Sequence, residues 1–294
     1  MNTIAVIGAT GAVGFRLIHA LQSSYRIVAV VRNREKRNFS CYTGVEVRQV
    51  DDISNIDSLA LALDGCDAIV NTGYIWFAEY IHQAVTRSRA AIRHIVFTGS
   101  TGIYTRLPSQ SAQRKREAET FIRERYRCHW TIIRPTMIYG HRDDRNISRL
   151  VKAVARYPIL PLIGKGSGLI QPVLIHDLVK AYETALLNSK YYDKSYNIGG
   201  AKAYSNRELI TCVASSVGRQ ARFVPLPAAL VRSGVTLLSM MGISPISREQ
   251  VERFQENKNI DLSAFITDFD YVPRDFEQGI QFLVRDLKEH GLLR

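Results

Sequence analysis

Short apolar runs alternate with longer amphipathic segments along the first part of the chain. Runs rich in valine, isoleucine and alanine, each the length of a buried strand, recur at residues 4–7, 27–31, 45–50, 68–71, 94–98 and 129–134. Segments with apolar residues at helical spacing lie between them, at 56–63, 78–88 and 111–126. Strands that alternate with helices form a parallel sheet with helices on both faces. The pattern therefore predicts the α/β class, with a Rossmann-like, doubly wound parallel sheet.

The pattern loosens after Gly140, where prolines and glycines mark an irregular connection before a helix near Asp177. We interpret Asp177 as the N-cap of that helix, and Ser205 with Glu208 as a capping box at the start of another helix. Residues 227–242 are typical of a packed lid helix rather than one on a membrane surface. We expect residues 1–145, completed by 172–200, to form a dinucleotide-binding domain, and 146–171 with 201–294 to form a smaller C-terminal substrate lobe.

The stretch "IAVIGATGAVGF" at residues 4–15 combines a buried strand, three spaced glycines and the start of an amphipathic helix. In this context Gly8 permits a tight turn, Gly11 lets backbone N–H groups approach a phosphate, and Gly14 lets the helix pack close to the strand. The helix N-terminus adds partial positive charge. The motif predicts a dinucleotide site, and the alternative is an ordinary turn between strand and helix.

The second strand ends in "VRNREKRN", a basic turn with Arg32 where NAD-selective versions of this fold carry an acidic residue for the ribose 2′-hydroxyl. A guanidinium can hold a 2′-phosphate through two hydrogen bonds, and Arg34, Lys36 and Arg37 add positive charge. We therefore expect NADP as the cofactor, with NAD less favoured. The alternative is a solvated basic loop.

The composition fits a globular protein and restricts its other partners. The chain has 294 residues, 46% of them hydrophobic, and a formal net charge of +12. Its densest charged segment, 113–127, alternates Glu117, Glu119 and Glu124 with arginines at helical spacing, which favours a salt-bridged solvent face over nucleic-acid binding. A membrane-surface role rests on charge alone. No signal segment or membrane span is evident, so a cytoplasmic location is expected, and the scattered cysteines predict neither a disulfide framework nor a metal site.

Several motifs, taken in order, resemble the extended short-chain dehydrogenase/reductase family, which includes NAD(P)-dependent nucleotide-sugar epimerases and dehydratases. They are "GATGAVG", the aspartate of "DDISNIDSL", "FTGSTGIY", "RPTMIYG" and "QPVLIHDLVKA". The likeness spans most of residues 2–200, while 201–294 match only loosely. The residues that this resemblance and the glycine motif assign to the cofactor are Gly8, Thr10, Gly11, Ala12, Val13, Gly14, Arg32, Asn33, Arg37, Asp52, Ile53, Asn71, Thr72, Gly73, Thr98, Lys115 and Pro135.

Catalysis in this family uses a tyrosine, a lysine four residues later on the same helix, and a serine or threonine from a strand end. The resemblance implies that the lysine is Lys115, where it would hold the nicotinamide ribose, and that the strand-end hydroxyl is Ser100. Ser111 stands where the tyrosine is expected, and a serine hydroxyl, with its far higher pKa, is no substitute at neutral pH. The catalytic candidates are therefore Ser100, Lys115, Ser111 and Tyr104, with Tyr139 as another hydroxyl that could reach a substrate.

These features predict an atypical NADP-dependent oxidoreductase or epimerase that acts on a carbonyl or secondary alcohol of a small molecule, such as a nucleotide sugar. The missing tyrosine leaves a second interpretation open, a catalytically silent NADP-binding sensor or scaffold. The related isoflavone-reductase-like group, in which a lysine serves as base without a tyrosine, keeps the enzyme tenable. Tyr74, Trp76 and Phe77 either wall the nicotinamide pocket or pack, with packing favoured. The sequence leaves a homodimer open.

Overall fold

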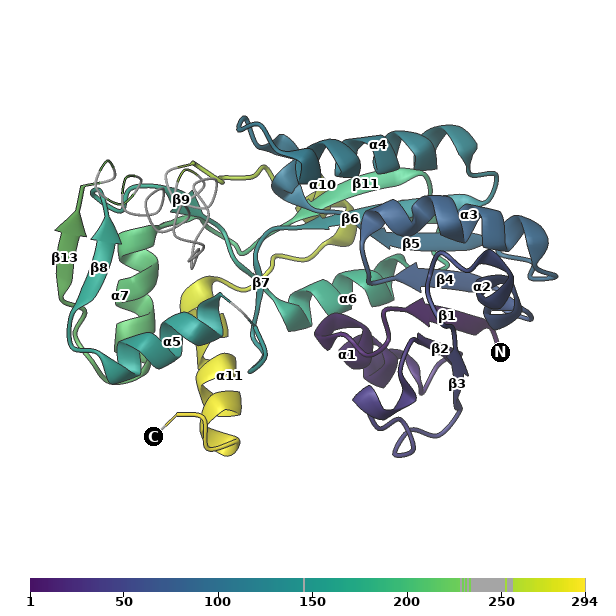
Figure 1. Cartoon of the computed structure of the whole chain (residues 1–294), viewed down its shortest axis with the longest axis horizontal. Helices are drawn as coiled ribbons and strands as arrows, with labels where there is room; N and C mark the ends of the chain where they lie inside the picture. The colour runs from purple at the N-terminus through teal and green to yellow at the C-terminus, as the bar shows by residue number, and fades with distance from the viewer. Residues whose placement is uncertain are drawn as a thin grey trace.

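A seven-stranded parallel sheet forms the centre of the molecule (Figure 1). The computed structural model describes residues 1–144, 146–227 and 256–293, with the isolated positions 229, 231, 233 and 252. The strand order is β11-β6-β5-β4-β1-β2-β3, and every neighbouring pair is parallel. These strands are β1 (Thr3–Ile7), β2 (Arg26–Val31), β3 (Val45–Gln49), β4 (Ala68–Asn71), β5 (His94–Thr98), β6 (His129–Pro135) and β11 (Lys194–Ile198). The predicted α/β class and parallel sheet are confirmed.

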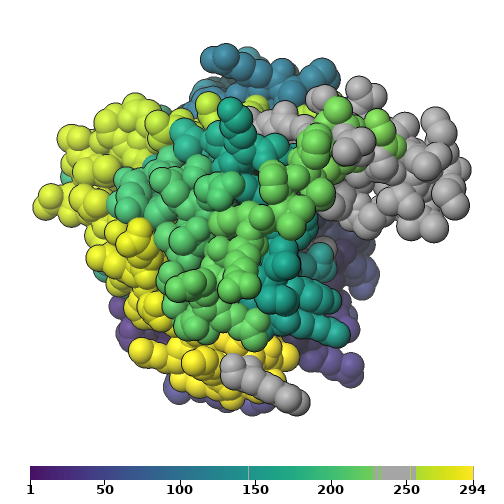
Figure 2. All heavy atoms as spheres, turned by 90° about the vertical axis from the view of Figure 1, so that its left-hand side faces the viewer, coloured from purple at the N-terminus to yellow at the C-terminus, as the bar shows by residue number. Residues whose placement is uncertain are grey.

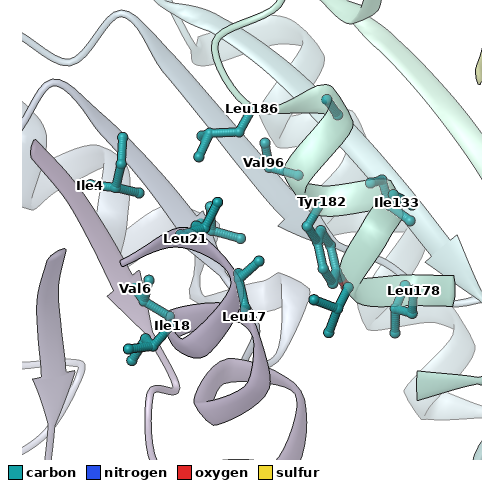
Figure 3. Close-up of a cluster of buried hydrophobic side chains, with 14 of the residues drawn as sticks. Ile4, Val6, Leu17, Ile18, Leu21, Val96, Ile133, Leu178, Tyr182 and Leu186 are labelled. Atoms are coloured by element: carbon teal, nitrogen blue, oxygen red, sulfur yellow. The ribbon is translucent and has the colours of Figure 1, made fainter. Parts of the chain in front are cut away.

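Helices cover both faces of this sheet because its central strands are apolar on both sides. The helices of one face are α1 (Ala12–Leu21) and α6 (Ile175–Ala185), and those of the other are α2 (Ile56–Leu63), α3 (Ala78–Arg87) and α4 (Gln110–Arg125). On the first face, Leu17 and Leu21 of α1 and Tyr182 of α6 lie over the strands that carry Ile4 and Ile133 (Figure 3). All five side chains are fully buried, so α1 is held firmly beside the end of β1.

A smaller lobe lies beyond the carboxyl ends of the strands, at the left of Figure 1. Its elements are α5 (Ile147–Arg156), α7 (Asn206–Ser216), α11 (Phe276–Glu289) and the paired strands β7 (Ile138–Tyr139) with β10 (Val173–Leu174), β9 (Leu169–Ile170) with β12 (Tyr204–Ser205), and β8 (Leu160–Ile163) with β13 (Phe223–Leu226). The predicted capping box is confirmed, because Ser205 Oγ accepts from Glu208 N–H at 3.1 Å and the Glu208 carboxylate accepts from Ser205 N–H at 2.7 Å. Most of the predicted lid helix, 227–242, lies outside the described residues.

The chain passes between the sheet and the lobe several times. After β6 it enters the lobe, returns through β10 to α6 and β11, and leaves again toward β12. The later helix α10 (Ser263–Phe269) packs on β11, and its Phe265 and Phe269 belong to the same buried cluster as α1 and α6. This helix therefore packs on the sheet, whereas the predicted boundary groups it with the lobe. None of the helices in the described part of the chain is both long and apolar enough to span a membrane.

Asp177 links these parts, and the prediction that it caps its helix is wrong. The helix α6 begins at Ile175, and its N-cap, Leu174, makes no side-chain cap. The buried Asp177 carboxylate instead accepts from the Tyr271 hydroxyl at 2.6 Å and from the Arg274 N–H at 2.8 Å, and it pairs with the Arg274 guanidinium. Asp177 thereby ties α6 to the segment that leads into α11.

Candidate active site

The glycine motif forms a tight turn between β1 and α1. Gly8 has a φ of +81°, a conformation that favours glycine. A Cβ on Gly8 would lie 2.8 Å from Thr72 Oγ1 and 3.1 Å from Gly73 N. A Cβ on Gly14 would lie 2.8 Å from the same hydroxyl and would also overlap the Gly8 carbonyl oxygen. The end of β4 and the first turn of α1 therefore both lie against the loop, in agreement with the tight turn and close packing expected of Gly8 and Gly14.

The first backbone N–H groups of α1 are left without partners inside the helix. Gly11 is the N-cap; its own N–H donates to the Gly8 carbonyl at 2.9 Å, and helical bonding begins with the Phe15 N–H to the Gly11 carbonyl at 2.9 Å. The N–H groups of residues 12–14 consequently have no acceptor within the helix. No side chain caps this end, and the first turn carries no acidic residue. The cradle fits a phosphate group, because it offers donors, partial positive charge and no competing carboxylate.

The basic turn after β2 is near the same helix. Arg32 is exposed, and Asn33 caps the short 3-10 turn that follows by accepting a backbone N–H at 2.8 Å. The Arg37 guanidinium lies over the Phe15 ring, 5.2 Å from its centroid, and Arg37 Nη2 is 3.4 Å from Asp143 Oδ2. Of the two arginines assigned to the cofactor, Arg37 is thus already paired, while Arg32 is open to solvent.

The turn predicted to contact the adenine follows β3 and is closed by its own side chains. The Asp52 carboxylate accepts from the Ser54 N–H at 2.9 Å and from the Ser54 hydroxyl at 2.6 Å. These hydrogen bonds favour the ionised carboxylate and lower the pKa of Asp52. Ile53 is buried in the core between the sheet and the helices α2, α3 and α4. Asp52 therefore shapes this turn, and Ile53 anchors it to the sheet.

Polar side chains at the ends of β4 and β5 brace the neighbouring loops. The buried Asn71 side chain accepts from the Gly73 N–H at 3.0 Å, and the Thr72 hydroxyl donates to the Ile7 carbonyl at 2.9 Å. The Thr98 hydroxyl donates to the Asn71 carbonyl at 2.7 Å. These contacts fix the shape of the carboxyl edge. Direct contact of the same residues with a cofactor stays a prediction.

The three aromatic residues after β4 differ in their exposure. The Tyr74 and Trp76 rings stack with 4.4 Å between centroids, and the Arg114 guanidinium lies 4.7 Å from the centroid of Trp76. Trp76 and Phe77 are half-buried against the core between the sheet and the helices α2, α3 and α4, whereas Tyr74 is 61% exposed. Packing is therefore confirmed for Trp76 and Phe77, while Tyr74 leaves most of its surface open.

Ser100 and Lys115 come together at the short helix η3 (Thr101–Tyr104) after β5. Ser100 is the N-cap of η3, and its Oγ accepts from the Gly102 N–H at 3.1 Å. Lys115 reaches the same helix from α4: Ser100 Oγ and Lys115 Nζ lie 3.1 and 3.3 Å from the point where a Cβ of Gly102 would stand. Ser111, one helical turn before Lys115 on the same side of α4, is exposed. The structure thus brings a hydroxyl and an amine together at the carboxyl edge of the sheet.

The Tyr104 hydroxyl lies between an amide and a guanidinium. It donates to Asn197 Oδ1 at 3.0 Å and accepts from Arg134 Nη1 at 3.2 Å. Arg134 is 8% exposed; its Nε and Nη2 donate to the two carboxylate oxygens of Glu119 at 2.7 and 2.5 Å. Burial alone lowers the pKa of Arg134, but the hydrogen bonds and charge of Glu119 outweigh it and the pKa is raised. A fixed positive charge therefore faces a phenol that is 49% exposed.

The prediction that the acidic residues of 113–127 share a solvent face is wrong for Glu119. This residue is 3% exposed, because its side of α4 faces the sheet where Arg134 emerges from β6. Arg123 of the next turn adds an outer ion pair at 3.0 Å. Sequence reasoning missed Arg134 and Asn197 as site residues. The available signal was the arginine of "RPTMIYG", because a cation within a strand that is expected to be buried needs a partner.

Tyr139 does not reach this edge. It lies in β7, fully buried in the lobe, with its ring 5.0 Å from that of Phe276. Its hydroxyl has no hydrogen-bond partner within the described ranges, and burial raises its pKa. The prediction that Tyr139 could reach a substrate is therefore wrong. Pro135, expected to line the cofactor, ends β6, and its carbonyl accepts from the Thr101 hydroxyl at 3.3 Å.

The chain belongs to the NAD(P)H-binding family, because the sequence model of that family matches residues 8–154, which is half of the chain. The match begins at Gly8 and includes Ser100, Lys115 and Arg134. It covers the glycine loop and the whole network around Tyr104 except Asn197. The resemblance to NAD(P)-dependent epimerases and dehydratases, predicted from the motifs, is confirmed.

Similar proteins include both enzymes and a subunit of a complex. The chain is 24% identical over 264 residues to N-acetyl-α-D-glucosaminyl-diphospho-ditrans,octacis-undecaprenol 4-epimerase of Escherichia coli O157:H7, covering 78% of this chain and 76% of that protein. It is 27% identical over 150 residues to mitochondrial NADH dehydrogenase (ubiquinone) 1 alpha subcomplex subunit 9 of Arabidopsis thaliana, covering 51% of this chain and 37% of that protein. The fold matches UDP-glucuronic acid 4-epimerase from Bacillus cereus, solved with UDP-glucuronic acid and NAD, with a TM-score of 0.76, 18% identity and coverage of 98% and 99%. This structural match shows a shared fold.

Proposed function

We propose that this protein is an NADP-dependent oxidoreductase or epimerase that acts on a carbonyl or secondary alcohol of a sugar joined to a diphosphate. The observation that carries the proposal is the Tyr104 hydroxyl, held between Arg134 and Asn197 on the helix that Ser100 and Lys115 also contact. The sugar diphosphate is proposed because that chemistry is common to the name of the Escherichia coli relative and the ligand of the Bacillus cereus structure.

The chain offers a separate group for each part of the cofactor. In this proposal the glycine loop and the N–H groups of residues 12–14 hold the pyrophosphate, Arg32 binds the 2′-phosphate, and Lys115 holds the nicotinamide ribose. When bound, the cofactor exchanges a hydride with a carbon of the substrate. The protein has to orient that carbon and to exchange one proton with the oxygen attached to it.

Tyr104 is the proposed proton donor. In the direction of reduction, its O–H bond breaks as the proton passes to the carbonyl oxygen of the substrate, and the hydrogen bond to Asn197 is given up. The Arg134 guanidinium, fixed by Glu119, stabilises the phenolate that remains. The reverse step returns the proton from the alcohol. Ser100 adds a hydroxyl that can orient the same oxygen.

Replacement of the phenol tests this role directly. We expect Tyr104→Phe to lower kcat at least about 100-fold with NADPH and a panel of ketones, aldehydes and nucleotide-sugar ketones. The Kd for NADPH should stay unchanged, because the phenol acts on the substrate. Tyr157→Phe is the matched control, since Tyr157 is a comparably exposed tyrosine of the smaller lobe. Equal turnover of Tyr104→Phe and the control would exclude Tyr104 as the donor.

The cofactor preference has its own test. Fluorescence titration should give tighter binding of NADPH than NADH to the parent protein, and Arg32→Asp should remove or reverse that preference because it replaces the exposed guanidinium with a carboxylate. Arg87→Asp is a control, because Arg87 is an exposed arginine at the end of α3. Equal affinities of the parent for both cofactors would contradict the assignment to NADP.

A second candidate function rests on Ser111, which stands where the family carries its tyrosine. A protein without that acid could bind NADPH as a sensor or scaffold. Tight NADPH binding together with no turnover across the panel would favour this alternative. Ser111→Tyr separates the two further: activity that appears only in this variant means that the parent site lacks a working donor.

A further inference from the structure

The outer end of the lobe carries an apolar sheet face that no element of the described chain covers. It is formed by β8 and β13, which pair in parallel with Val224 opposite Pro161 and Leu226 opposite Ile163. In Figure 1 these two strands form the far left of the molecule, and Figure 2 views the molecule from that side.

The two sides of β8 differ in burial, whereas β13 is largely open on both. Because side chains alternate along a strand, Leu160 and Leu162 of β8 point inward and are 7% and 3% exposed, while their partners in β13, Phe223 and Pro225, are half-buried and exposed. The outward face carries Val224 and Leu226, which are 46% and 37% exposed, and Ile159, in the bend just before β8, is 51% exposed. Pro161 is exposed on the same side. Val224, Leu226 and the paired Pro161 therefore form one group on the outward side, next to the exposed Ile159 at the start of β8.

The chain segments that form this face are basic. Residues 146–176 and 209–227, which include α5, both strands and most of α7, contain no aspartate or glutamate, and the acidic residue that precedes the second segment is Glu208 in the first turn of α7. Their charged residues are Arg149, Lys152, Arg156, Lys165, Arg219 and Arg222. Tyr157, at the end of α5, is 53% exposed with the Arg156 guanidinium 5.5 Å from its ring centroid. Exposed aliphatic side chains, a tyrosine and an excess of basic residues are the composition of a surface that enters the headgroup region of a membrane.

We propose that this face, defined by Tyr157, Ile159, Val224 and Leu226 and the surrounding basic residues, docks on a bilayer that contains anionic phospholipid. The aliphatic side chains enter the boundary between headgroups and acyl chains, while the basic residues remain at the level of the phosphates. A nucleic acid fits less well, because valine, isoleucine and leucine neither stack on bases nor bond phosphate. The inference does not depend on the cofactor site, which lies at the sheet edge.

Vesicle sedimentation of the full chain tests this proposal. The lipids are pure phosphatidylcholine, and phosphatidylcholine mixed with phosphatidylglycerol. We expect the parent to sediment with the anionic vesicles at low salt and to be released as salt rises, with little binding to the neutral ones. Ile159→Ser combined with Val224→Ser and Leu226→Ser should weaken binding at least about tenfold, because the serine side chains no longer bury aliphatic carbon in the bilayer. Arg149→Gln with Arg156→Gln should weaken it by a similar factor and flatten its dependence on salt.

Matched controls come from the part of the molecule that is built around the seven-stranded sheet. Leu61→Ser removes an aliphatic side chain that is 71% exposed on α2, and Arg26→Gln with Arg89→Gln removes two exposed cations there. These variants should bind anionic vesicles as the parent does. No sedimentation of the parent with anionic vesicles, or equal losses in control and patch variants, would overturn the proposal. It would also be overturned if heparin, a soluble polyanion, competed fully and the serine variant bound vesicles like the parent, because charge without aliphatic insertion would then account for binding.

Discussion

At the scale of single residues, Glu119 is held by two arginines in different environments. Arg134 meets its carboxylate with two hydrogen bonds, and its side chain is 9% exposed, whereas Arg123 makes one contact and its side chain is 42% exposed. A buried charge that loses its partner costs far more free energy than an exposed one, since water cannot replace the lost contact. The two arginines should therefore contribute very differently to stability although they share one carboxylate.

We expect Arg134→Met to lower the free energy of unfolding by about 3–5 kcal/mol, because Glu119 stays buried without its main partner. Arg123→Met should cost less than about 1 kcal/mol. Denaturant unfolding followed by circular dichroism measures both values. Similar losses in the two variants would mean that the buried Arg134–Glu119 pair stabilises the protein no more than the exposed Arg123–Glu119 pair. They would also weaken the proposal that Glu119 fixes Arg134 beside Tyr104.

At the scale of elements, the turn between β1 and α1 contains two glycines whose surroundings differ. Gly14 is buried where a side chain would meet Thr72 and the Gly8 carbonyl. Gly11 is exposed, has an ordinary φ of −73°, and a Cβ there would approach a single atom, the Gly8 carbonyl oxygen, at 3.1 Å. The same substitution at the two positions should therefore have different consequences.

Gly14→Val should lower the free energy of unfolding by about 3 kcal/mol, since it forces α1 away from the sheet. Gly11→Val should change it by no more than about 1 kcal/mol, yet remove NADPH binding, because its side chain stands where a phosphate must approach the backbone. Thermal melts and calorimetric titration give both readings. If Gly11→Val still binds NADPH, the loop is an ordinary turn.

A buried histidine couples β5 to β6 and to the end of α6. His94 Nδ1 accepts from the Leu187 N–H at 3.0 Å, so the neutral ring carries its proton on Nε2 and donates to Thr131 Oγ1 at 2.9 Å. Burial lowers the pKa of His94 from 6.5 to about 4. Protonation would remove the acceptor that Leu187 needs and place a charge in the core.

Stability should therefore fall as the pH falls. Between about pH 6.5 and pH 4 the unfolded chain binds a proton at His94 that the folded protein does not, so the free energy of unfolding decreases by roughly 3 kcal/mol over this window. The contribution is fully present above pH 6.5. His94→Gln should show a shallower acid decline in urea unfolding across this range. A residual slope is expected from His141, whose pKa burial also lowers to about 4. An unchanged slope in His94→Gln would contradict the assignment.

The strands and the glycine turn were predictable because their signals are local. A strand buried on both faces must be apolar throughout, and a turn with positive φ requires glycine, so residues 4–14 contain the information by themselves. Asp177 was not predictable in this way, since its partners Tyr271 and Arg274 stand 94 and 97 residues away. The predictions for Tyr139 and Glu119 were wrong for the same reason. Which side of an element is buried depends on what packs against it, and periodicity does not identify the partner.

At the scale of the whole molecule, the two parts are interleaved along the chain rather than joined end to end. The lobe is built from segments before and after β11, and α10 returns to the sheet after much of the lobe has been formed. Asp177 of α6 accepts hydrogen bonds from Tyr271 and Arg274, in the segment that joins α10 to α11. Movement of the lobe relative to the sheet therefore has to strain several connections at once, which favours a site of fixed geometry.

The same interleaving sets an order for folding during synthesis. β6 pairs with β5 on one side and with β11 on the other, so its outer edge stays unpaired while the ribosome makes residues 136–193, an interval of several seconds at about 5–20 residues per second. Unpaired strand edges are templates for aggregation, so the nascent N-terminal half should need chaperone protection until β11 emerges. An arrest-peptide assay should register folding force only for lengths that expose residue 198. Force released at lengths that expose β6 alone would show that the N-terminal half folds without its last strand.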